Sequence, residues 1–188
     1  MDRQPFLGFS LIELLVVMGI FTVISSLILA NHSRFNSSVL LNSLAYDMAL
    51  SVRQAQVYGL SVRGSASGFQ VGYGIHVTQG TSYVFFTDVN GNKRYDAGTD
   101  AIVQTYTVGQ GYQVSRFCGV KSDGASECSN ASSPISSLDI VFFRPNPDAV
   151  MYSDVGGPYS SGTVTVASGA QTRTIVVAST GQISVQNP

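Results

Sequence analysis

The stretch GFSLIELLVVMGIFTVISSLILA, residues 8–30, decides how this chain is built. From Phe9 to Ala30 it contains a single ionisable side chain, Glu13. These roughly 22 residues would form a helix of about 33 Å at about 1.5 Å per residue, which is long enough to cross the hydrocarbon core of a bilayer. The stretch therefore predicts a membrane-spanning helix near the N-terminus.

A cleaved secretory signal is the other interpretation of this stretch. The apolar core of a signal peptide is usually about 7–15 residues long and is followed by small residues at the cleavage site. Here Ile28 stands where such a site needs a small residue before Ala30, and a cut there would leave a chain that begins at Asn31. The length of the apolar run and its flanks therefore favour a retained membrane span.

Glu13 needs an explanation of its own, because an acidic side chain at the centre of a bilayer costs about 2.5–3.5 kcal/mol on insertion scales. One interpretation is that its carboxylate reaches back to the membrane interface. The alternative is that the carboxylate has a partner or a function.

The junction GFSLIELLVVMGIF closely resembles the class III leader junction of type IV prepilins and of type II secretion pseudopilins. The resemblance implies that residues 1–8 are a leader, and that a prepilin peptidase cuts between Gly8 and Phe9 and methylates the new Phe9 amine. It also implies that Glu13 neutralises the terminal amine of a neighbouring subunit, since two opposite buried charges are tolerable only as a pair. Because the leader holds Asp2 beside Arg3, the positive-inside signal rests on Arg3 and the terminal amine.

The same resemblance implies partners and a location. The partners are other pilin subunits in a homo- or hetero-oligomeric filament, the prepilin peptidase, an inner-membrane assembly platform, and membrane lipid before assembly. The location is the inner (cytoplasmic) membrane, crossed once with the C-terminal domain outside the cytoplasm, and then a pilus or pseudopilus at the cell surface.

A helical pattern continues beyond the membrane segment, over residues 31–59. Apolar side chains recur there at spacings of three and four, which is typical of an amphipathic helix with one face in a core; they are Leu41, Leu44, Met48, Val52 and Ala55. Gly59 is the expected stop. Together with residues 9–30, this predicts a single helix of roughly 75 Å.

From residue 60 to residue 188 the hydrophobic period changes to two, which predicts a β-rich head. Turn residues divide the expected strands, which cover residues 69–77, 83–87, 101–108, 112–117, 138–143, 150–152, 163–167, 173–178 and 182–186. Residues 122–137 are expected to form a polar loop. The fold class is therefore α+β, a long helix packed on an antiparallel β-sheet, and the resemblance implies the type IV pilin fold.

Two stretches of the head resemble a narrower group, the FimT and GspH minor (pseudo)pilins: residues 83–100 as a strand with its acidic loop, and residues 173–185 as a closing hairpin. In some members of that group, basic residues after the closing-hairpin glycine are associated with DNA uptake. Here Gln182 follows Gly181 and no Lys or Arg lies beyond it. The chain has a formal net charge of −1 and therefore lacks the excess of basic residues that is typical of a nucleic-acid-binding protein. DNA is not an expected partner.

The acidic loop raises a calcium hypothesis, and calcium is the only cofactor that the sequence suggests. Five side chains offer oxygens at suitable spacing, namely Asp88, Asn90, Asn92, Asp96 and Asp100. However, Lys93 stands where a calcium loop of the EF-hand type has glycine, and Thr99 stands where it has a bidentate glutamate. The alternative interpretation is a hairpin loop held by Asx turns, without a metal.

The two cysteines, Cys118 and Cys128, are expected to form a disulfide outside the cytoplasm, worth roughly 2–3 kcal/mol. Zinc is not expected, because two thiols are too few and His32 and His76 belong to different elements. Neither histidine lies in a nucleophile motif and no phosphate-binding glycine loop follows a strand, so an enzyme is not predicted. His76 is expected on the solvent face of its strand.

Two functions from different classes follow. The first is a structural filament subunit, major or minor, of a type IV pilus-like or type II secretion system. The second is a membrane-tethered extracellular binding or adhesion module, calcium-dependent through the Asp88 loop, in which the helix is only an anchor. Glu13 separates them, because a filament subunit needs this carboxylate and an anchor does not.

Overall fold

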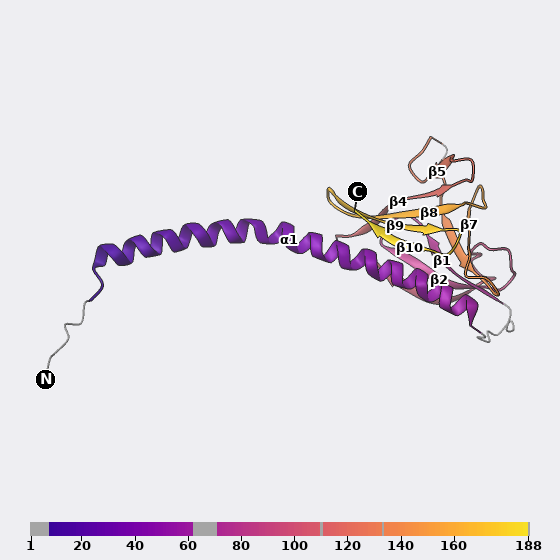
Figure 1. Ribbon diagram of the computed structural model, residues 1–188, viewed down its shortest axis with the longest axis horizontal. Coiled ribbons are helices and arrows are strands. Elements are labelled where there is room, and N and C mark those ends of the chain that lie inside the picture. Colours follow the sequence, from indigo (N-terminus) through magenta and orange to yellow (C-terminus); the bar gives the residue numbers. More distant parts are fainter. Residues whose placement is uncertain (1–7, 62–70, 110, 133, 188) are drawn as a thin grey trace. The chain divides into compact units, whose positions relative to one another are not determined.

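The structure is a computed structural model that describes residues 8–61, 71–109, 111–132 and 134–187 of the 188-residue chain, without the side chains of residues 30–36. Apart from Gly8, the expected leader lies outside these residues. Within these residues, one helix, α1, is followed by ten strands, β1 to β10; Figure 1 labels α1 and most of the strands. The chain divides into two compact units, Met1–Val39 and Leu40–Pro188, so the boundary between them falls inside α1.

Helix α1 spans Leu11–Leu60. In the first unit, Leu11–Leu29 is a 19-residue segment with a mean hydropathy of 2.5, which is long and apolar enough to cross a membrane. Its large side chains are exposed on every side of the helix, and Leu11 and Phe21 are 81% and 67% exposed. A helix that is apolar all round requires an apolar environment, which the described part of the chain does not supply.

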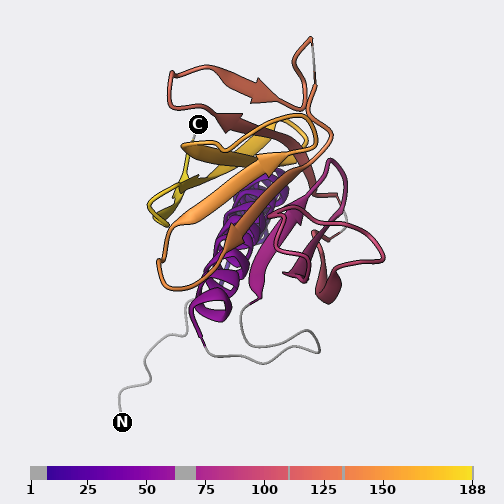
Figure 2. The same cartoon turned by 90° about the vertical axis from the view of Figure 1, so that its right-hand side faces the viewer.

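In the described part of the second unit, antiparallel strands form two five-stranded sheets. Figure 2 shows these strands beside α1. The first sheet has the order β3-β2-β1-β6-β7 and contains β1 (Gly72–Val77), β2 (Ser82–Asp88), β3 (Ala101–Thr107), β6 (Leu138–Phe142) and β7 (Ala149–Ser153). The second has the order β10-β9-β8-β4-β5 and contains β4 (Gln113–Val120), β5 (Ser126–Cys128), β8 (Ser161–Ser168), β9 (Gln171–Ala178) and β10 (Ile183–Gln186).

The α+β class is confirmed, but the expectation of one sheet was wrong. The chain leaves the first sheet after β3, because β4 pairs with β8, a strand some forty residues further along, rather than with β3. Strand β5 lies inside the expected polar loop at residues 122–137. Its three residues have no hydrophobic alternation, and the strand is located by Cys128, which lies directly opposite Cys118 of β4.

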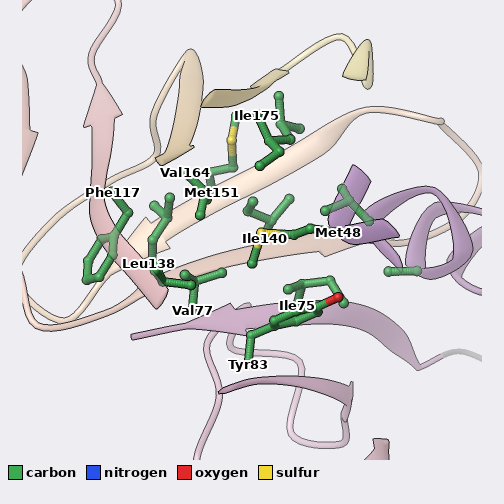
Figure 3. Packing of buried hydrophobic residues seen from close by; sticks show 14 of the residues in the cluster. Met48, Ile75, Val77, Tyr83, Phe117, Leu138, Ile140, Met151, Val164 and Ile175 are labelled. Atoms are coloured by element: carbon green, nitrogen blue, oxygen red, sulfur yellow. The ribbon is translucent and has the colours of Figure 1, made fainter. Parts of the chain in front are cut away.

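The core of the head lies between the two sheets and the second part of α1 (Figure 3). The predicted apolar stripe is confirmed, because Leu41, Met48, Val52 and Ala55 are buried and Leu44 is partly buried against the same core. Both sheets contribute the rest of this interior, including Ile75, Val77, Phe117, Leu138, Ile140, Met151, Val164 and Ile175. The alternation expected for the first strand therefore directs its apolar residues into this core.

Gly59 does not act as the expected stop, because α1 continues to Leu60. The glycine instead allows a close approach between α1 and β6. A Cβ atom at Gly59 would lie 2.4 Å from the carbonyl oxygen of Phe142. The missing side chain is thus required by packing and not by a helix cap.

Candidate functional site at the N-terminal junction

Gly8, Phe9 and Ser10 precede the first helical residue and are exposed. The Glu13 backbone N–H donates a hydrogen bond to Ser10 Oγ at 3.3 Å, and the Leu14 N–H donates to the Ser10 carbonyl at 3.2 Å. Ser10 therefore caps α1, because its hydroxyl satisfies an amide that has no partner inside the helix. The peptide bond between Gly8 and Phe9 consequently lies outside the helix and is accessible.

Glu13 lies in the first turn of α1 and is exposed. A carboxylate at this place is favoured by the partial positive charge of the helix N-terminus. Ser10 and Glu13 also have the S-x-x-E spacing of a capping box, which anchors the first turn. Ser10 is a cap that the sequence analysis did not identify, although its S-x-x-E spacing to Glu13 is a signal for it.

The apolar segment that follows the junction is exposed on all sides of the helix. None of the membrane-length segment Leu11–Leu29 is buried against the rest of the described chain. In water such a surface would cost about 25 cal/mol for each Å² that is left exposed. The segment is therefore suited to lipid or to the apolar surfaces of other helices.

The model of the prokaryotic N-terminal methylation motif matches residues 5–29, which include the junction, the cap, Glu13 and the whole segment Leu11–Leu29. This match supports a type IV pilin or pseudopilin-like subunit with a single-pass membrane anchor. Its class III leader implies processing by a prepilin peptidase and pilin-type assembly with other subunits. No curated protein and no solved structure matches the chain.

The five candidate calcium ligands do come together, in the loop between β2 and β3. The two carboxylate oxygens of Asp88 accept hydrogen bonds from the N–H groups of Gly91 (2.8 Å) and Lys93 (2.9 Å). Those of Asp100 accept from Val89 (2.9 Å) and Asp96 (2.8 Å). Each carboxylate thus accepts two hydrogen bonds from backbone N–H groups of the same loop and holds the loop in a closed shape.

The remaining polar side chains of this loop also bond to one another. The amide groups of Asn90 and Asn92 both donate to Asp96 Oδ2, and the Asn90 side-chain oxygen accepts from the Asn92 N–H. Burial raises the pKa of Asp88, and the backbone donors oppose this shift. Among the described residues, no group of three His, Cys, Asp or Glu side chains could hold a metal ion. The hydrogen bonds within the loop fit the Asx-turn interpretation.

His76 corrects another expectation, because it does not point into solvent. Its side chain is only 16% exposed, and its Nδ1 lies 2.6 Å from Oδ1 of the buried Asp139. The ring of Tyr95, from the loop between β2 and β3, lies 4.7 Å from the imidazole. The loop therefore folds over this face of the first sheet, which the strand pattern alone could not indicate.

The expected disulfide is confirmed. Cys118 of β4 and Cys128 of β5 are joined, and no free cysteine lies in the part of the chain that the structure describes. The bridge fixes β5 at one edge of the second sheet. The disulfide is distant in sequence from α1, and its role is to hold two strands of the head together.

Proposed function

We propose that this chain is a structural subunit, major or minor, of a type IV pilus-like filament or a type II secretion pseudopilus, assembled through α1. One observation carries the proposal. An exposed Gly8–Phe9 bond stands directly before a capped helix whose first 19 residues are predominantly apolar and uncovered, inside the matched methylation motif. An anchor alone would need the apolar helix but not this junction.

The proposed steps are consistent with this geometry. A prepilin peptidase hydrolyses the accessible Gly8–Phe9 bond and methylates the new amine of Phe9. Before assembly the apolar surface of Leu11–Leu29 lies in lipid, and in the filament it packs against the same segment of other subunits. The Glu13 carboxylate then neutralises the Phe9 amine of a neighbour, because either charge would be costly alone in a low-dielectric interior.

The proposal includes the location of the subunit. The helix crosses the inner membrane with the head outside the cytoplasm, and processed subunits leave the membrane for the fibre. The disulfide between Cys118 and Cys128 supports a head that lies outside the cytoplasm, because disulfides persist in oxidising compartments.

A charge-removal experiment at Glu13 tests the proposal. Glu13→Gln keeps the size of the side chain and Glu13→Ala removes it, so any effect common to both reports the charge. We expect both variants to be cut after Gly8 but to form roughly tenfold fewer surface filaments or fewer still, because an unpaired buried charge costs several kcal/mol. Sheared filaments are counted by electron microscopy, and processing is followed by the mass of the N-terminal peptide.

Glu13→Asp is the control, since it retains the charge and should assemble better than Glu13→Gln. Filaments of normal number and length in Glu13→Ala would contradict the proposal and favour a tethered binding module, whose anchor does not need the carboxylate.

A further inference from the structure

The side of α1 that faces away from the core carries an apolar ridge. Tyr46, Leu50 and Val57 are 54%, 64% and 54% exposed, whereas Met48 and Val52 of the same turns are buried. An amphipathic helix on a sheet normally presents charged and polar residues to solvent. Three large apolar side chains in three turns therefore indicate a surface that another molecule covers.

A groove lies on each flank of this ridge. The first has a volume of about 370 Å³ and lies between α1 and the first sheet, where Asp47 and Leu50 face Tyr83 and Tyr106. The second has a volume of about 400 Å³ and lies between α1 and β10, where Leu50 and Arg53 face Ile183. Leu50 lines both grooves, so it stands on the ridge between them.

The two grooves carry opposite charges. Among the described residues that line the grooves, the carboxylate of Asp47 is the only charged group in the first, and the guanidinium of Arg53 is the only one in the second. Both residues are exposed, and neither takes part in an ion pair within the described chain, whose two pairs are His76–Asp139 and Lys121–Glu127. Six residues apart, they lie about 9 Å along and roughly 120° around the helix from each other, too far to pair directly.

We propose that these grooves are the two halves of a head-to-tail contact between copies of this chain, in which Arg53 of one copy pairs with Asp47 of the next. The proposal rests on the proposed filament function and assigns a contact of the head to it. Because the two surfaces differ, the contact is heterologous, and repeating it builds an open helical array rather than a closed dimer. Leu50 supplies the apolar centre of the contact, and the charges at its rim set the register.

A charge-reversal cycle in the full-length chain, expressed in cells that assemble the filament, tests the contact. We expect Asp47→Arg and Arg53→Asp each to reduce the number of filaments by about tenfold, because each places like charges together. The double variant should recover most of the loss, since the pair is restored with its signs exchanged. Asp148→Arg, an exposed site on the loop between β6 and β7, is the matched control and should assemble as wild type.

Cysteine cross-linking gives a second readout that does not depend on filament number. In oxidised filaments, a chain with both Asp47→Cys and Arg53→Cys should give a ladder of covalent multimers, whereas each single variant should stay monomeric. Dimers from a single variant would show a two-fold contact and overturn the proposal, as would the absence of a ladder. Single reversals that assemble normally would overturn it too, while the Glu13 result would still decide the proposed function. A wild-type chain that is never cut after Gly8 would contradict both the proposed contact and the proposed function.

Discussion

Asp139 and His76 lie side by side on β6 and β1, with Oδ1 of the carboxylate 2.6 Å from Nδ1 of the imidazole. The backbone N–H of Tyr95 also bonds to the carboxylate, and burial raises the pKa of Asp139 while these two donors oppose the shift. The Tyr95 ring packs on both His76 and Phe86. One buried carboxylate thus ties the loop between β2 and β3 to the first sheet.

Removing this carboxylate should loosen the loop. We expect Asp139→Ala to lower the free energy of unfolding by about 2–3 kcal/mol, because His76 and the Tyr95 N–H lose their buried acceptor. Urea unfolding followed by tyrosine fluorescence measures the change. Asp148→Ala, at an exposed position, is the control and should stay within about 0.5 kcal/mol of wild type. Equal stability of the two variants would show that the pair does not hold the loop.

The buried side chain of Tyr83 should make the stability of the head depend on pH in the alkaline range. Burial raises the pKa of Tyr83 from 10.0 to about 12, with the Ser51 hydrogen bond opposing the shift. Above pH 10 the unfolded chain therefore releases this proton while the folded chain keeps it, so stability falls as pH rises toward 12. The loss from this residue is about 2–3 kcal/mol by pH 12.

Tyr83→Phe isolates this effect, because the variant lacks the titrating group and keeps the ring. At pH 8 it should be about 1 kcal/mol less stable than wild type, since it loses the 2.9 Å hydrogen bond with Ser51. Its stability should then fall less steeply than that of wild type above pH 10. Parallel slopes for the two proteins in urea unfolding would refute the assignment.

Gly59→Ala should destabilise the head even though alanine is the better helix former. The added Cβ would lie 2.4 Å from the Phe142 carbonyl oxygen, so α1 or β6 must move. We expect a net loss of about 1–3 kcal/mol, the usual cost of overpacking. Ser43→Ala, at an exposed position of the same helix, should be neutral or slightly stabilising, and thermal unfolding separates the two. A gain in Gly59→Ala would mean that the glycine serves only as a helix end.

The loop between β2 and β3 should be indifferent to calcium. Asp88→Ala leaves the Gly91 and Lys93 N–H groups without acceptors, so we expect a loss of about 1–3 kcal/mol that is equal with millimolar calcium and with a chelator. Wild type should unfold at the same temperature in both solutions. A melting temperature that rises with calcium concentration would show binding to the folded chain and would revive the tethered binding module.

Local patterns were enough to predict α1 and most of the strands. The stripe from Leu41 to Ala55 repeats every three or four residues because one helix face is buried, and the sequence displays that period directly. The methylation motif at residues 5–29 could also be predicted, since its residues lie close together in the chain. The pairing of Cys118 with Cys128 followed from their proximity and the expected compartment.

Long-range relationships could not be predicted in the same way. Two sheets form because β4 pairs with β8, and alternation identifies a strand without identifying its neighbour. His76 is covered by Tyr95, a contact that depends on how a loop folds back. The opposite charges of Asp47 and Arg53 were visible in the sequence, but the grooves that contain them exist only once β2, β3 and β10 lie beside α1.

Mass spectrometry of the N-terminal peptide, from sheared surface filaments and from membranes, tests the central claim most directly. The account predicts that the chain in the sheared fraction begins at a methylated Phe9. A chain that begins at Met1 and stays in the membrane fraction would contradict the filament function, and one that begins at Asn31 would show an ordinary secreted protein.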